Sequence, residues 1–279
     1  MLFHGLRRLF GPLVIDYPRI DYLYQSYGSV SHLYGRGFSL YGLLPDCPVD
    51  RTDIANRIHA REFDLIIYGS IHRDQSFFYS IIHLYPRHQV IFIDGEDQAH
   101  GIYGLTEHGL YFQRELSSPH LSVHPIHFAI PSEKISPLSA VPKIKVKATL
   151  DPRDRSTYIY EDESSYYHDY ASSLFAITMK KGGWDCLRHL EIMANNCIPW
   201  FLDLNECPSF TCTHLPKPEL LEALQYQDRP SQFWDSEEGH ARWLSLHHRI
   251  KTHFVRHCTT EALARYVIDT QQKEAQAAK

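Results

Sequence analysis

The sequence predicts an α/β protein of two Rossmann-like lobes, each a parallel sheet flanked by helices. Two observations lead to this prediction. Buried apolar runs alternate with helical segments in both halves of the chain, and a crossover between parallel strands needs a dozen or more residues. A proline-rich stretch, residues 131–142, lies near the middle of the 279 residues. We therefore expect an N-terminal lobe at 1–135, a C-terminal lobe at 143–270 and a frayed tail at 271–279.

The first half opens on an amphipathic segment, residues 1–10, which ends at Gly11-Pro12 and predicts a helix. Residues 19–44 are rich in Tyr, Gly and Ser, so we expect a long functional loop with short helical turns. Doubly wound lobes normally open on a strand, so the first strand is expected to be missing or to lie outside this chain. The strands expected here are 13–17, 63–68, 89–93 and 110–113, and the further helices are 51–61 and 77–84.

The second half repeats this alternation after the proline-rich stretch. Its clearest apolar run is 174–179, and Gly182 and Gly183 separate that run from a helix expected at 185–195. We also expect the last helix to cross back to the first lobe. The remaining strands expected are 143–150, 155–160 and 197–202, and the remaining helices are 164–172, 219–227, 238–258 and 260–269.

Composition excludes several function classes. The net charge is −5, so no global basic field favours nucleic acid as a partner. The six cysteines are scattered and form no CxxC pair, which predicts free thiols in a cytoplasmic protein and no zinc site. No run of 18 apolar residues predicts a membrane span, although the apolar side chains of residues 1–10 allow a peripheral membrane contact.

The stretch after residue 179 carries the strongest chemical signal. Two lysines and two glycines join a buried strand to a helix, so backbone N–H groups and cationic side chains converge on one turn. An Arg one turn into the helix has the planar fork that suits phosphate, and a Glu three residues later can accept two sugar hydroxyls. The residues expected to bind a nucleotide are Lys180, Lys181, Gly182, Gly183, Trp184, Asp185, Arg188 and Glu191. On these grounds alone, an exposed Arg188–Glu191 ion pair on an ordinary helix is equally consistent.

A resemblance favours the nucleotide site. The run Glu191-Ile-Met-Ala-Asn-Asn-Cys-Ile-Pro199 resembles the signature of GT-B glycosyltransferases, a glutamate followed by small residues, a glycine or cysteine, a hydrophobic residue and a proline. Residues 182–203 are similar to the exostosin-type and spore-protein glycosyltransferase-like (CgeB-like) branches of that group. Softer similarity to proteins described only as glycosyltransferases covers residues 63–73 and 90–97.

The resemblance implies a function and a division of roles. The protein would transfer a sugar from a UDP- or GDP-sugar to a glycan or related acceptor in the cleft between the lobes. The lobe at 1–135 would be the acceptor side, and the lobe at 143–270 would bind the nucleotide sugar. Glu191 would hold the ribose, and the basic residues before it would neutralise the diphosphate, so that neither a metal nor another cofactor is required. Many retaining members carry a second glutamate at the position of Gly183, so the stereochemistry stays open.

Catalytic residues are expected at the carboxyl ends of strands in the first lobe, where open α/β sheets bind ligands. An inverting transferase needs a base for the acceptor hydroxyl, and Asp94 or Glu96 is the first candidate, with His72 second. An acidic turn is the alternative for this segment. Arg114 and Glu115 follow the next strand, where an ion pair is the simpler expectation.

Two rival functions remain open at this stage. The missing glutamate at Gly183 and the short first lobe are consistent with a non-catalytic glycan- or nucleotide-binding module. A phosphatase or nucleotide hydrolase is the other rival, but its nucleophile would have to be Cys186, whose neighbours do not match a phosphatase loop.

Overall fold

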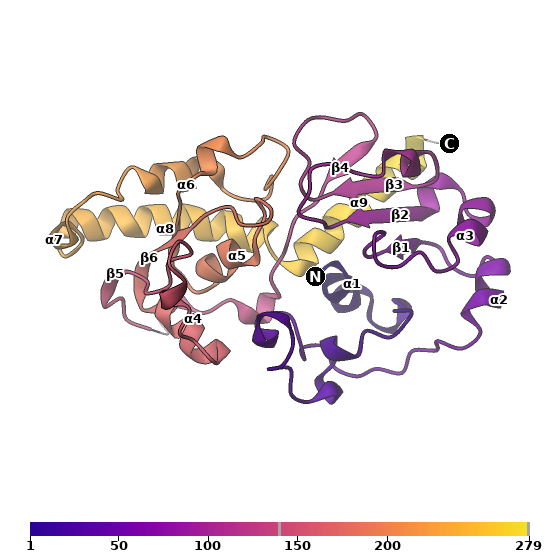
Figure 1. Ribbon diagram of the computed structural model, residues 1–279, viewed down its shortest axis with the longest axis horizontal. Coiled ribbons are helices and arrows are strands. Elements are labelled where there is room, and N and C mark those ends of the chain that lie inside the picture. Colours follow the sequence, from indigo (N-terminus) through magenta and orange to yellow (C-terminus); the bar gives the residue numbers. More distant parts are fainter. Residues whose placement is uncertain (139–140, 278–279) are drawn as a thin grey trace.

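In the computed structural model the chain forms two parallel sheets flanked by helices, lying side by side (Figure 1). The structure describes residues 1–138 and 141–277. The mixed α/β architecture and the parallel sheets confirm the fold class predicted from the sequence. Strands follow one another in chain order across both sheets, β1-β2-β3-β4 in the first and β5-β6-β7 in the second.

The first lobe contains α1 (Leu2–Phe10), α2 (Ile54–His59), β1 (Ile66–Tyr68), α3 (Phe78–Leu84), β2 (Val90–Asp94), β3 (Leu110–Gln113) and β4 (Val123–Pro125). Alternation along β2 gives this sheet two apolar faces. Val90 and Phe92 pack in one cluster with side chains of α2 and α3. Ile91 and Ile93 pack on the opposite face. Every residue of β2 is buried, as expected for a strand covered on both sides.

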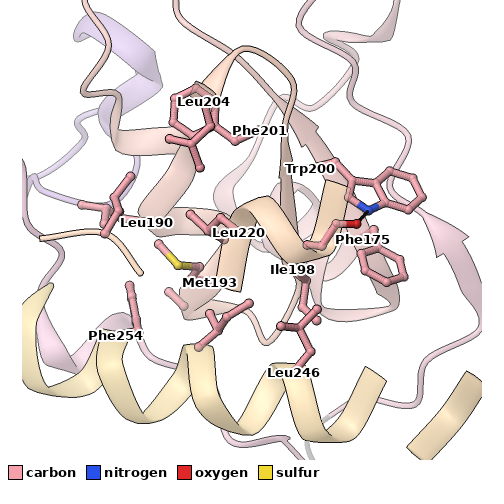
Figure 2. Close-up of a cluster of buried hydrophobic side chains, with 14 of the residues drawn as sticks. Phe175, Leu190, Met193, Ile198, Trp200, Phe201, Leu204, Leu220, Leu246 and Phe254 are labelled. Carbon is pink, nitrogen blue, oxygen red and sulfur yellow. Dashed lines mark hydrogen bonds between the residues drawn. The ribbon is translucent and has the colours of Figure 1, made fainter. Parts of the chain in front are cut away.

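The second lobe contains β5 (Lys145–Lys147), α4 (Glu163–Ala171), β6 (Ser173–Thr178), α5 (Leu187–Ala194), β7 (Ile198–Phe201), α6 (Lys217–Leu224), α7 (Ser231–Trp234) and α8 (Glu237–His257). Phe175 of β6 stacks on Trp200 of β7 with ring centroids 4.5 Å apart. Leu246 and Phe254 of α8 close the same cluster from below, as Figure 2 shows. Trp200 satisfies its only polar atom by donating a hydrogen bond of 3.0 Å to the Ala223 carbonyl.

The last helix, α9 (Thr260–Ala277), leaves the second lobe and covers the first sheet (Figure 1). Leu263 and Val267 pack against Ile91 and Ile93, and Tyr266 donates a hydrogen bond of 2.8 Å to the Pro125 carbonyl. The helix also packs on α1 at Gly5, where a side chain would collide with the Thr260 carbonyl. Gln271 donates to the His88 carbonyl and Arg87 donates to Glu274, so the helix continues through Ala277, where the sequence predicted a frayed tail at 271–279. Residues 278–279 lie outside the described residues.

Two predicted strands are wrong. In 13–17, the buried Asp16 accepts hydrogen bonds from Arg7, Arg51, Tyr24 and the Ile20 amide, and these bonds hold an irregular turn. In 155–160, Asp154 accepts from the Ser156 amide and begins a 3₁₀ turn at Arg155–Thr157. β4 was not predicted, because three residues are too few to show a period. The loop with short helical turns predicted at 19–44 is confirmed.

Candidate functional site

The two lobes meet through Arg114, which follows β3 and is only 2% exposed. Its guanidinium donates to the Asp185 carbonyl at 2.6 Å, to Glu115 at 2.9 Å and to the Gly95 carbonyl at 3.0 Å, and it also pairs with Asp97. The expected Arg114–Glu115 ion pair is therefore present, and it also reaches across to the second lobe. A buried guanidinium with this many partners fixes the segments that follow β2 and β3 relative to the segment around Asp185 in the second lobe.

Glu115 binds the turn that the sequence assigned to a diphosphate. Its carboxylate accepts the backbone N–H groups of Trp184 at 2.9 Å and Asp185 at 3.0 Å. A side chain at Gly183 would collide with this carboxylate, and one at Gly182 would collide with Asp97. The paired glycines thus admit two carboxylates of the first lobe, and the two amides are occupied in this conformation.

The two lysines of the turn point in different directions. The Lys180 ammonium lies over the Trp184 ring, 4.9 Å from its centroid, and the Lys180 amide donates to Asp203. The Lys181 ammonium donates to the Pro152 carbonyl at 2.5 Å. The Lys181 ammonium is therefore engaged by a backbone carbonyl, whereas that of Lys180 lies against an aromatic ring.

Asp185 faces the protein interior. Its Oδ2 accepts the Phe128 amide at 2.5 Å, and its Oδ1 lies 3.7 Å from His214 Nε2. Burial raises the pKa of Asp185 to about 7, and the nearby Arg114 opposes that rise. This carboxylate ties the turn to the segment that connects the lobes.

Arg188 and Glu191 lie on α5 and do not form the exposed ion pair that was the alternative expectation. Glu191 is 6% exposed and accepts hydroxyl groups on both oxygens, from Tyr166 at 2.7 Å and from Ser39. Burial raises the pKa of this carboxyl, and the two hydroxyls and Arg188 oppose the rise. Arg188 donates to the Tyr158 hydroxyl at 3.2 Å, while its Nη1 is buried without a partner among the described residues.

Ser39 belongs to a covering segment, residues 36–39, that the first lobe lays over α4 and α5. Its amide donates to Glu163 at 2.6 Å, and the neighbouring Phe38 ring stacks on Tyr166 at 5.7 Å. Ser39 has φ of 68°, in the left-handed region that costs a non-glycine residue about 1 kcal/mol or more. The contacts with α4 and α5 therefore hold a strained backbone in place.

The catalytic candidates of the first lobe lie close together at the end of β2. Asp94 is 1% exposed and accepts from the Tyr111 hydroxyl at 2.6 Å and the Glu96 amide at 3.2 Å. His72 Nε2 lies 3.1 Å from Asp94 Oδ1, and the His72 side chain is 30% exposed. Glu96 lies 3.6 Å from Arg73. Asp94 is thus enclosed and positioned to orient His72, the member of the pair that reaches solvent.

Sequence reasoning missed the residues that surround Arg188 and Glu191. Ser39, Tyr158 and Tyr166 are separated from Glu191 by 152, 33 and 25 positions, and no local pattern marks them. The high tyrosine content was the only signal, since a tyrosine hydroxyl is a common partner for a buried charge.

No protein-family model matches the chain, and no curated protein matches it. Within residues 1–138 and 141–277, no helix has the length and apolar character needed to cross a membrane. The same described ranges contain no group of three or more His, Cys, Asp or Glu side chains arranged to hold a metal ion.

Proposed function

We propose that the protein is a nucleotide-sugar-dependent glycosyltransferase whose donor site is formed by Arg188 and Glu191. One observation carries the proposal: a buried carboxylate accepts two hydroxyls, and a buried guanidinium nitrogen three residues away on the same helix has no partner in the described part of the chain. A ribose offers two adjacent hydroxyls, and a diphosphate offers oxygens to an arginine fork. A nucleoside diphosphate supplies both groups in one molecule.

The reaction proposed here uses residues from both lobes. The acceptor oxygen forms a bond to the anomeric carbon of the donor sugar, the bond from that carbon to the diphosphate oxygen breaks, and the nucleoside diphosphate leaves. The acceptor proton passes to His72, which Asp94 orients. Arg188 and Lys180 would stabilise the charge that develops on the departing diphosphate.

Donor binding requires the covering segment to move. The Ser39 hydroxyl occupies one Glu191 oxygen, so a ribose hydroxyl replaces it when residues 36–39 lift from α5. The strained φ of Ser39 and the exposed position of Arg36 lower the cost of that movement.

The second candidate function is a nucleotide-binding module without catalysis. The amides of Trp184 and Asp185 favour this second function. Both donate hydrogen bonds to Glu115, so a diphosphate would lack those two donors. Binding would then rest on Arg188 and Glu191, and the leaving group would receive less stabilisation than transfer requires.

A thermal-shift titration with UDP and GDP, combined with a turnover assay, tests both candidates. UDP or GDP should raise the melting temperature of the wild type, and Arg188→Ala should abolish the rise. Arg229→Gln, an exposed arginine beside Phe233, is the matched control and should bind normally. Glu191→Gln should weaken nucleoside diphosphates far more than inorganic diphosphate.

Turnover then separates the two candidates. Release of nucleoside diphosphate from a panel of UDP- and GDP-sugars supports the transferase. Binding without release supports the module. If neither nucleotide shifts the wild type, both candidates lose their donor site.

A further inference from the structure

Two of the six cysteines lie in one tight turn of the second lobe, between β7 and α6. Cys207 begins this turn and Cys212 follows five residues later. The Thr211 amide donates a hydrogen bond of 3.1 Å to the Pro208 carbonyl, which closes the turn between the two cysteines. All six cysteines are free thiols in this structure, so the turn contains two reduced sulfur atoms.

The Cys207 thiol packs against the backbone of this turn. Its sulfur lies 3.6 Å from the Pro208 carbonyl oxygen and 3.7 Å from the Thr211 carbonyl oxygen. The Thr211 carbonyl belongs to the peptide group that joins Thr211 to Cys212. The Lys217 ammonium donates hydrogen bonds to the same two carbonyls, at 3.0 Å and 2.7 Å. A thiol, an ammonium and the backbone of the second cysteine thus meet around two carbonyl oxygens.

The two thiols differ in acidity and in access to solvent. A hydrogen bond from the Cys212 thiol lowers the pKa of Cys207, burial opposes this effect, and the charge of Lys217 lowers the pKa further. The same hydrogen bond, followed by burial, raises the pKa of Cys212. Cys207 is half-buried, whereas Cys212 is only 1% exposed. Cys207 is therefore the thiol that reaches solvent and ionises more readily.

This turn also contacts the first lobe. The Thr211 hydroxyl donates a hydrogen bond of 2.9 Å to the carbonyl of Leu116, the residue after Glu115. Glu115 in turn accepts the Trp184 amide. A bond between the two cysteines would therefore form at the junction between the lobes.

We propose that Cys207 and Cys212 form a reversible disulfide, with a low-molecular-weight disulfide such as oxidised glutathione as the oxidant. A thiol that is accessible and readily ionised, next to a second thiol that can resolve a mixed disulfide, is the usual arrangement of a redox-sensitive cysteine. This inference rests on the turn alone and does not depend on the proposed function.

The reaction proceeds in two exchange steps. The Cys207 thiolate attacks one sulfur of glutathione disulfide, a mixed disulfide forms, and one glutathione leaves as a thiolate that takes up a proton. Cys212 then loses its proton to solvent and attacks the Cys207 sulfur, and the second glutathione leaves in the same way. In balance, two protein thiols are oxidised to a disulfide and one glutathione disulfide is reduced to two thiols.

Thiol mapping after equilibration in glutathione buffers, from fully reduced to fully oxidised, tests this assignment. Free thiols are alkylated in denaturant, and cleavage after Glu206 and Glu219 isolates residues 207–219, which contain only these two cysteines. In oxidising buffer this peptide should contain an internal disulfide, and dithiothreitol should restore both thiols. In the reduced native protein, Cys207 should react with iodoacetamide about tenfold faster than Cys212 or more.

Three variants separate the two steps. Cys212→Ser should stop the reaction after the first step and retain one glutathionyl group on Cys207. Cys207→Ser should leave the buried Cys212 unmodified, because its partner is missing. Cys47→Ser is the matched control, since it removes a half-buried thiol of the first lobe and should form the disulfide as the wild type does.

The wild type alone decides the outcome, even if a variant does not fold. Two alkylated thiols in the peptide 207–219 at every glutathione ratio would overturn the assignment. A glutathionyl group that persists on Cys207 of the wild type would also overturn it, because Cys212 would then not act as the second nucleophile. A disulfide that joins either residue to a different cysteine would have the same consequence.

Discussion

The carboxylate of Glu115, at the end of β3 in the first lobe, accepts a hydrogen bond of 2.9 Å from the backbone N–H of Trp184 in the second lobe. This bond and its neighbour at Asp185 place a buried side chain where the sequence led us to expect a diphosphate. An internal carboxylate therefore occupies the backbone N–H groups at the end of the turn, and it also joins the lobes. The close approach of Glu115 and Asp97 explains the paired glycines without a ligand.

Gly183→Ala tests this junction. The new methyl group would collide with Glu115, so either the carboxylate or the turn has to shift, and we expect a loss of about 1–3 kcal/mol in the free energy of unfolding. Gly104→Ala is the matched control, because a side chain there meets nothing within 4 Å. Urea denaturation of both variants measures the difference. Equal stabilities would contradict the close contact between Gly183 and Glu115.

Asp185→Asn should change how stability depends on pH. An aspartate in the unfolded chain has a pKa of about 3.9, whereas burial raises that of Asp185 to about 7. Between these values the folded state binds more protons than the unfolded state, so this residue lowers the free energy of unfolding as pH rises, and its effect is constant above the folded pKa.

The variant cannot titrate at this position, so it should gain stability relative to the wild type between pH 4 and pH 7, by up to about 4 kcal/mol. Neutral buried histidines such as His127, whose pKa burial lowers to about 4, contribute the opposite slope at acidic pH, but they are present in both proteins and cancel in the difference. Chemical denaturation at several pH values provides the measurement. A difference that stays constant with pH would refute the buried, protonated state of Asp185.

Ser39→Ala should strengthen nucleoside diphosphate binding. The substitution removes the hydroxyl that competes for Glu191, so a ligand no longer has to displace it. A hydrogen bond to a charged group is worth about 1.5–3 kcal/mol, and we expect at least tenfold tighter binding of UDP or GDP. Ser31→Ala, an exposed hydroxyl elsewhere in the same loop, should bind as the wild type does. Weaker binding in Ser39→Ala would mean that this serine contacts the ligand directly.

His72→Gln should lower kcat for sugar transfer by about 10²–10⁴-fold without changing the affinity for the nucleoside diphosphate. His83→Gln is the control, since that exposed histidine of the first lobe forms a hydrogen bond with the carbonyl of Tyr79 in its own helix. Added imidazole should restore part of the activity to His72→Gly. Full activity of His72→Gln, in an enzyme that does turn over, would return the role of base to Glu96.

Sequence patterns were sufficient to predict the buried parallel strands, which recur in both lobes. The apolar runs 63–68, 89–93 and 174–179 predicted the parallel strands that the structure ends at Tyr68, Asp94 and Thr178, because strands covered on both faces have continuous apolar sequences. The strand expected around Asp16 failed for a different reason. Its buried carboxylate binds Arg7 and Arg51, which lie nine positions before it and 35 after it, and such contacts leave no local pattern.

The site was predictable in its positions but not in its contacts. The turn at residues 180–185 and the histidine after β1 lie at strand ends, as expected for parallel sheets. One partner of Glu191, Ser39, comes from a loop 152 residues away, and the other, Tyr166, comes from α4. Glu115 accepts hydrogen bonds from amides for which the sequence indicates no partner. Occupancy of a backbone donor depends on tertiary packing, which one sequence does not reveal.

The return of α9 to the first lobe has a consequence for the order of folding. The segments that complete the second lobe, from β5 to α8, leave the ribosome before α9, which supplies one covering layer of the first sheet. During synthesis, the face of β2 that carries Ile91 and Ile93 thus remains exposed to solvent until Leu263 and Val267 leave the ribosome. We expect the middle of the chain to reach its native packing first, while the lobe synthesised earliest matures last.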